Sequence, residues 1–171
     1  CGDEDEVLDT DCLYLVDQDE NDNGDGEDEP AGRGGFNEDK AINYLKDNFT
    51  LPYGAGQCIN NMVQALIEGG ISGLKGKPIK AACLYGPILK GLGFATVNRT
   101  ITYYKGDIAI IQGYDGGKYC KGSKVVCGHI QMYDGNQWLS DFPQSRPFWP
   151  GKGYADARPS PSFEILHWPG N

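Results

Sequence analysis

The chain has 171 residues, which is enough for one domain with a substantial apolar core. Its apolar content is 39%, and no stretch approaches the roughly 20 apolar residues that a membrane-spanning helix needs. The formal net charge is −9, so a predominantly basic, nucleic-acid-binding surface is not indicated.

The charge is distributed unevenly along the chain. Residues 1–35 contain 14 of the 24 acidic residues and a single basic residue, which gives this segment a charge of −13. Residues 36–171 carry +4, without a basic cluster, which is compatible with an anionic polymer as substrate. Blocks of like charge bury little apolar surface. We therefore predict a solvated, flexible leader over 1–35 and one globular domain over 36–171.

Two features of the acidic leader have alternative interpretations. The apolar stretch Cys12–Val16 is typical of a strand and can dock on the domain. The segment Asp19–Asp25 follows the first seven positions of an EF-hand calcium loop, but the twelfth position falls on Pro30 and no helices flank it. A plain spacer is therefore favoured over a calcium site.

The first residue of the chain is a cysteine followed by small and acidic residues. This start resembles a processed bacterial lipoprotein, in which the N-terminal cysteine carries the lipid. The resemblance implies contact with a membrane through Cys1 and a place in the cell envelope, on the cell surface or outside the cell. The alternative is a chain end that falls on a cysteine by chance.

Six cysteines in an exported chain raise the question of disulfides. If Cys1 is lipidated and Cys58 is reduced, the other four cysteines allow three pairings. We favour a bridge between Cys120 and Cys127, which flank a predicted turn. There is no CxxC pair and there are only two histidines, so we expect neither a metal site nor another cofactor.

Three helices are predicted in the first half of the domain. Residues 37–49 have Asn37 as an N-cap, acidic residues in the first turn and apolar residues at helical spacing. A second helix begins near Gln57 and ends at the glycine pair 69–70. A third helical segment is expected over 78–92, with an interruption at Pro87.

The second half of the domain has the alternating pattern of strands separated by turns. The predicted strands are 94–104, 107–113, 124–134, 137–142 and 162–168. Helices followed by an antiparallel sheet indicate an α+β fold, with one face of the sheet against the helix that begins near Cys58.

Cys58 is the first candidate for chemistry, because it lies where a glycine-rich turn meets a helix. The unpaired N–H groups of a helix N-terminus stabilise a thiolate and can bind an oxyanion. A buried structural cysteine is the alternative. A nucleophile also needs a base. His129 lies on a predicted strand directly after Gly128, whose missing side chain permits close approach. His167 lies in an apolar run and is expected to be a packed or edge-strand histidine.

Asp141 follows His129 across a predicted hairpin turn at residues 134–136. Two adjacent antiparallel strands can bring the Asp141 carboxylate towards the imidazole, where it would fix the tautomer. The register of the hairpin is left open.

The motifs "GQC", "GDIAII", "GHIQMYDG" and "QWLSDF" occur in this order over residues 50–142. This arrangement resembles the CHAP (cysteine, histidine-dependent amidohydrolase/peptidase) and NlpC-type cell-wall hydrolases. The resemblance implies a papain-like fold with Cys58 as nucleophile, His129 as general base and Asp141 as the orienting group. It also implies that Gln57 and Tyr53 shape the oxyanion or substrate site.

By the same resemblance the chain is a monomeric hydrolase of peptidoglycan, either a muramoyl-alanine amidase or an endopeptidase of the stem or cross-bridge. Ile59 replaces the aspartate that often follows the NlpC nucleophile, so the CHAP branch fits better. Two other functions stay open: a catalytically silent surface module that binds wall material or a protein, and a toxin aimed at competing cells. The domain's aromatic residues suit a glycan–peptide groove, although aromatics are often core: Tyr103, Tyr104, Trp138, Phe148 and Trp149.

Overall fold

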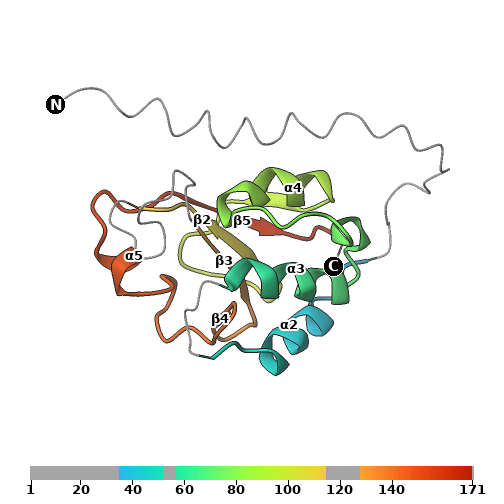
Figure 1. Cartoon of the computed structure of the whole chain (residues 1–171). Coiled ribbons are helices and arrows are strands. Elements are labelled where there is room, and N and C mark those ends of the chain that lie inside the picture. Colours follow the sequence, from blue (N-terminus) through green and yellow to red (C-terminus); the bar gives the residue numbers. More distant parts are fainter. Residues whose placement is uncertain (1–34, 52–56, 115–127, 171) are drawn as a thin grey trace.

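The computed structural model describes residues 35–51, 57–114 and 128–170 (Figure 1). The leader, Tyr53 and the Cys120–Cys127 pair lie outside these residues, so the predictions about them are not tested. The described elements, in chain order, are α2 (Glu38–Asp47), α3 (Cys58–Glu68), the 3-10 helices η1 (Ser72–Leu74) and η2 (Ala82–Leu84), α4 (Tyr85–Gly91), β1 (Ala95–Val97), β2 (Ile108–Ile111), β3 (His129–Tyr133), β4 (Trp138–Leu139), α5 (Lys152–Asp156) and β5 (Phe163–His167).

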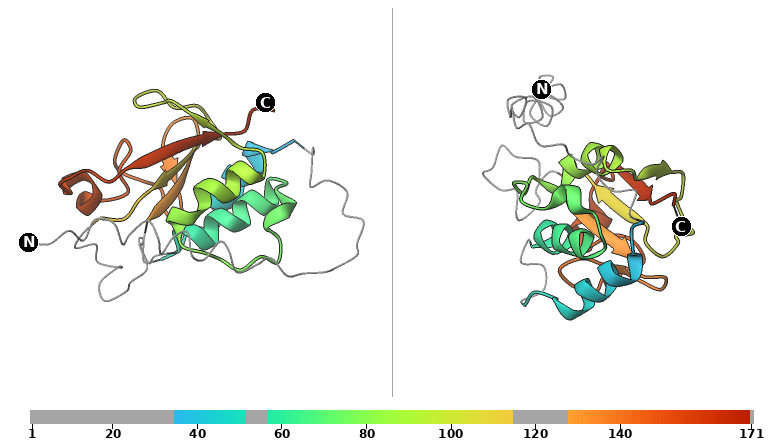
Figure 2. Two further views of the ribbon diagram at one scale, coloured as in Figure 1. Left: turned by 90° about the horizontal axis from the view of Figure 1, so that it is seen from above. Right: turned by 90° about the vertical axis from the view of Figure 1, so that its right-hand side faces the viewer.

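The strands form one sheet in the order β1-β5-β2-β3-β4, and every neighbouring pair is antiparallel. Figure 2 shows α2, α3 and α4 together on one face of this sheet, whereas α5 lies apart from them at the far end. The last strand in the chain, β5, therefore lies inside the sheet between β1 and β2. This architecture confirms the prediction of an α+β fold with helices packed on an antiparallel sheet.

The first two helices follow the predicted local signals. The Asn37 side chain caps α2 by accepting a hydrogen bond of 2.9 Å from the Lys40 backbone N–H. Helix α3 follows Gln57 and ends at Gly69. Both helices bury one apolar face: Ala41, Ile42 and Leu45 in α2, and Met62, Val63, Ala65 and Leu66 in α3.

The third predicted helix was placed wrongly at its start. Residues 78–81 are not helical, and the helical segment begins at Ala82 with η2 and continues as α4. Pro87 does not interrupt α4, because it is the third residue of that helix. A backbone N–H in the first helical turn has no intrahelical partner, so the missing N–H of proline costs nothing there.

The predicted strand 94–104 is also shorter than expected, since only Ala95–Val97 pair with β5. The segment that follows turns around the buried Asp107 carboxylate. That carboxylate accepts hydrogen bonds from the Arg99 side chain and, at 2.8 Å, from the Tyr104 backbone N–H. His167 Nδ1 lies 2.8 Å from the same carboxylate, which agrees with the prediction that His167 is a packed histidine.

The sheet is buried on both faces. Ile108 and Ile110 of β2 pack in the core under the helices, and the alternate residues Ala109 and Ile111 belong to a second cluster on the other face. The second cluster contains most of the aromatic residues considered for a substrate groove. Tyr103, Trp138, Phe148 and Trp149 pack there, whereas Tyr104 is exposed. None of the described helices is long and apolar enough to cross a membrane.

Candidate active site

Cys58 is the first residue of α3, and it meets β3 at Ile130. The backbone N–H groups of Ile130, Ile59 and Cys58 itself donate hydrogen bonds to the Cys58 sulfur. Ile130 directly follows His129 in the chain, so the helix N-terminus and the histidine-bearing strand come together at this sulfur. The structure therefore places the Cys58 sulfur beside the strand that carries His129.

The Cys58 side chain is buried, and this burial sets the protonation of its thiol. Desolvation raises the pKa of the Cys58 thiol from 9.0 to about 11. The three backbone N–H groups oppose this shift, whereas the negative charge of Asp141 adds to it. At neutral pH the resting cysteine is therefore a thiol rather than a thiolate.

His129 is the first residue of β3 and is also buried. Burial lowers the pKa of the His129 imidazole from 6.5 to about 3, so the ring is neutral at physiological pH. The rings of Phe142 and Tyr154 lie beside it, with centroids 6.4 Å and 6.3 Å from the imidazole centroid. A neutral imidazole has one nitrogen that can accept a proton.

Gln144 makes a polar contact to this imidazole. Its side-chain nitrogen lies 2.8 Å from His129 Nε2, and its side-chain oxygen is buried without a hydrogen-bond partner among the described residues. Turning the amide by 180° exchanges the two atoms, and the choice between them rests on the hydrogen-bond network. With Oε1 towards His129, it accepts the Nε2–H proton, and the lone pair of the imidazole is then on Nδ1.

An irregular turn carries Gln144 to this position. Strand β4 contains only Trp138 and Leu139, after which the chain reverses through a bridge between Leu139 and Pro143. The Gln144 backbone N–H then donates to the Trp138 carbonyl at 2.9 Å. Gln144 was not predicted as a site residue. The reversal after β4 has no clear sequence signal, so the hairpin pattern pointed to Asp141 instead.

Asp141 is buried at the start of α3. Its Oδ2 accepts a 3.2 Å hydrogen bond from the Gln57 backbone N–H, and its Oδ1 accepts one of 3.0 Å from the Ser140 hydroxyl. Its main-chain oxygen accepts from the Thr50 N–H at 2.8 Å. These contacts hold Asp141 next to Cys58 and fix the chain on both sides of the residues 52–56.

Gln57 and Gly128 flank the two candidate catalytic residues. The side chain of Gln57 accepts a hydrogen bond from Asn60 in the first turn of α3. A Cβ at Gly128 would overlap the carbonyl oxygen of Ile111, so a glycine is required where β2 and β3 approach beside His129. This confirms the close approach predicted at Gly128. In the described ranges, no group of three His, Cys, Asp or Glu side chains can hold a metal ion.

One solved structure decides the family. It is the type VI effector–immunity complex Tae3–Tai3 from Ralstonia pickettii, which matches with a TM-score of 0.64 and 30% identity over 78% of this chain and 99% of the matched chain. The chain belongs to the Tae3 family of type VI effectors. The selenomethionine form of the same complex matches with a TM-score of 0.59 and 32% identity over 74% of this chain and 97% of that chain.

Similarity to the Tae3 effector structures confirms the papain-like fold expected from the CHAP and NlpC resemblance. The search with family models and the search of curated proteins found no match. The relationship to Tae3 therefore rests on structural similarity combined with 30% sequence identity.

Proposed function

We propose that this chain is a cysteine hydrolase that cleaves amide bonds of bacterial peptidoglycan. The observation that carries the proposal is the Cys58 sulfur at the N-terminus of α3, hydrogen-bonded to the N–H of the residue that follows His129. The motif resemblance to CHAP and NlpC enzymes and membership of the Tae3 effector family support it.

The proposed reaction is acyl transfer to the thiol. The neutral imidazole of His129, with Nε2–H held by Gln144, takes the Cys58 proton on Nδ1 while the sulfur attacks the amide carbonyl. A C–S bond forms, and the backbone N–H of Cys58 stabilises the oxyanion. The imidazolium then protonates the leaving amine and the C–N bond breaks. Water hydrolyses the thioester, which restores the thiol and releases the carboxylate.

The resting thiol and imidazole are both neutral, which favours general-base catalysis over a preformed thiolate–imidazolium pair. In this mechanism the charges develop only during attack, when substrate carbonyl and backbone N–H groups are in contact. The short-lived imidazolium is held by Gln144 in the orientation needed to deliver its proton.

The proposal keeps all the site residues expected from the sequence and assigns their roles from the contacts. Asp141 stays the third residue of the proposed site and fixes the start of α3 through Gln57, while Gln144 contacts the imidazole. Gln57 and Tyr53 remain the proposed residues for the oxyanion and substrate.

The proposed class of reaction is tested by digesting purified peptidoglycan with the full chain. Both a muramoyl-alanine amidase and an endopeptidase expose one new amine for each bond cleaved, whereas a glycosidase exposes a reducing sugar. New amines without new reducing ends are expected, and mass spectrometry of the fragments identifies the bond. Release of reducing ends, or no release from several wall chemotypes, would contradict the proposal and favour a silent binding module.

A second proposal concerns the biological target. The similar solved structure is an effector–immunity complex, which favours a toxin that acts on the wall of another cell and is neutralised by an immunity protein. Directing the chain to the periplasm of a bacterial host should cause lysis, and Cys58→Ala should prevent it. Wall digestion in vitro without lysis would instead favour remodelling of the producer's own wall.

The envelope location and the lipid on Cys1 remain proposals. Labelling with a radioactive fatty acid in a bacterial host tests the lipid directly, with Cys1→Ala as the control. A monomer is expected from size-exclusion chromatography with light scattering.

A further inference from the structure

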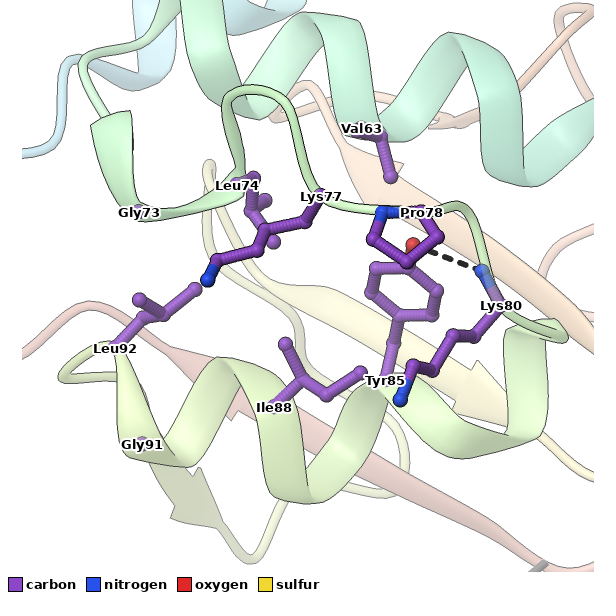
Figure 3. Close-up of a pocket in the computed structure, with 10 residues that line it drawn as sticks. All are labelled: Val63, Gly73, Leu74, Lys77, Pro78, Lys80, Tyr85, Ile88, Gly91 and Leu92. Carbon is purple, nitrogen blue, oxygen red and sulfur yellow. Dashed lines mark hydrogen bonds between the residues drawn. The ribbon is translucent and has the colours of Figure 1, made fainter. Parts of the chain in front are cut away.

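An apolar groove lies between α3 and α4 (Figure 3). Its volume is about 330 Å³, which accommodates a few apolar side chains. Its walls come from Val63 of α3, from the η1 segment and from α4, and its lining residues are Val63, Gly73, Leu74, Lys77, Pro78, Lys80, Tyr85, Ile88, Gly91 and Leu92. Neither Cys58 nor His129 lines the groove.

The segment that forms the groove is basic. Residues 71–92 contain four lysines and neither aspartate nor glutamate. Lys77 and Lys80 line the groove, and in Figure 3 their side chains run towards α4 on either side of Ile88. Lys90 pairs with Glu164 at 3.1 Å, but none of the described carboxylates forms an ion pair with Lys77. The groove is thus an apolar surface with a positive rim.

The acidic leader joins the domain beside this groove. The backbone carbonyl of Gly35 lies 3.7 Å from the position of a Cβ on Gly70, and Gly73 three residues later lines the groove. Phe36 fixes this entry point by packing on Phe94, with ring centroids 5.3 Å apart. The first described residue is therefore held close to η1.

The leader contains a segment of matching chemistry. Residues 9–20 read DTDCLYLVDQDE, in which the apolar run Cys12–Val16 has two acidic residues before it and three after it. The connection from this segment to Gly35 is 14 residues long, from 21 to 34. A flexible chain of this length spans about 19–22 Å on average. A tethered segment has an effective concentration in the millimolar range, so weak contacts are enough for docking.

We propose that residues 9–20 of the leader dock in the α3–α4 groove of the same chain. The apolar run fills the groove, and the flanking carboxylates meet Lys77 and Lys80 on its rim. The free energy comes from burial of the apolar side chains, and the charges provide orientation and specificity. This interaction does not depend on the proposed hydrolase activity.

The test is zero-length cross-linking of the intact chain with a carbodiimide, followed by peptide mass spectrometry. The reagent joins a carboxylate to an amine only when the two are in contact. Links from the acidic residues of segment 9–20 to Lys77 or Lys80 are expected. Lys40 on α2 is exposed and outside the groove, so its links to the leader should be several-fold fewer.

Two variants and one isotope control complete the experiment. Leu13→Ser combined with Leu15→Ser keeps every charge and should reduce the Lys77 and Lys80 links several-fold. Lys40→Gln should leave them unchanged. A mixture of unlabelled and ¹⁵N-labelled chains should give links only within one isotopic form. Equal linking to Lys40, links that survive the double serine variant, or links mainly between chains would overturn the proposal.

Discussion

The side-chain amide of Gln144 lies 2.8 Å from Nε2 of His129, and both side chains are buried. In the proposed mechanism, a partner on Nε2 leaves Nδ1 as the nitrogen that takes and returns the proton. In that mechanism Gln144 is a positioning residue that acts through His129, whereas Asp141 is held at the start of α3 by the Gln57 backbone N–H. Replacing Gln144 should therefore change kcat and its pH dependence, whereas replacing Asp141 should change the reactivity of the Cys58 thiol.

Gln144→Ala should lower kcat on the order of a hundredfold with little change in KM, because the imidazole loses the contact that fixes its tautomer and orientation. Gln144→Glu should restore part of kcat and move the acidic limb of the pH profile upward, since a carboxylate favours the imidazolium. Steady-state kinetics across pH measure both effects. A loss in Gln144→Ala that Gln144→Glu does not recover, together with an unchanged profile, would indicate a merely structural role.

Asp141→Asn should change the reactivity of the thiol. The Asp141 charge raises the pKa of the Cys58 thiol, so its removal should lower that pKa and speed alkylation at a fixed pH below about 11. Alkylation of the Cys58 peptide by iodoacetamide, followed from pH 7 to pH 11, gives the pKa in both proteins. If Asp141 instead orients His129, Asp141→Asn should reduce kcat as strongly as Gln144→Ala does.

His129 should make the folded state sensitive to acid. Its pKa falls from 6.5 to about 3 on folding, so the unfolded chain binds the proton more tightly in that range. The contribution of neutral His129 to the free energy of unfolding is present above pH 6.5. It is lost as the pH falls towards 3, by on the order of 1 kcal/mol per pH unit. Urea unfolding of wild type and His129→Asn measures it. Equal pH dependence in the two proteins would contradict the burial of a neutral His129.

Asp107 should matter for stability and not for chemistry. It is fully buried and accepts hydrogen bonds from Arg99 and the Tyr104 backbone, with His167 at 2.8 Å. Asp107→Ala should cost about 3–5 kcal/mol, because it leaves Arg99 without its buried partner. Thermal unfolding checks the loss, and kcat per folded molecule should be unchanged at low temperature. A reduced kcat with normal stability would place Asp107 in the site.

The sequence predicted the parts of the site that local patterns determine. Cys58 follows a turn and begins a helix, and His129 follows a glycine and begins a strand, so each could be placed by periodicity and helix-end signals. That the Cys58 helix and the His129 strand meet at Ile130 could be predicted only from the fold class, which was inferred from the order of the motifs.

Local sequence patterns could not predict Gln144 at the site, because its position depends on nonlocal contacts. The hairpin after β3 was predicted. The reversal that brings Gln144 to His129 depends on the bridge between Leu139 and Pro143 and on the hydrogen bond from the Gln144 N–H to the Trp138 carbonyl. The overlong strand 94–104 has a similar cause. Its second half turns towards Asp107, a buried acceptor that a period-two pattern does not reveal.

The central claim is that Cys58 is the nucleophile, and peptidoglycan digestion by three matched proteins tests it most directly. The three proteins are wild type, Cys58→Ala and Cys83→Ala. Each variant lacks one thiol of the wild type, and Cys83 is as buried as Cys58. Mass spectrometry should find amide-cleavage fragments with wild type and Cys83→Ala and none with Cys58→Ala. Fragment release by a folded Cys58→Ala protein would contradict the account.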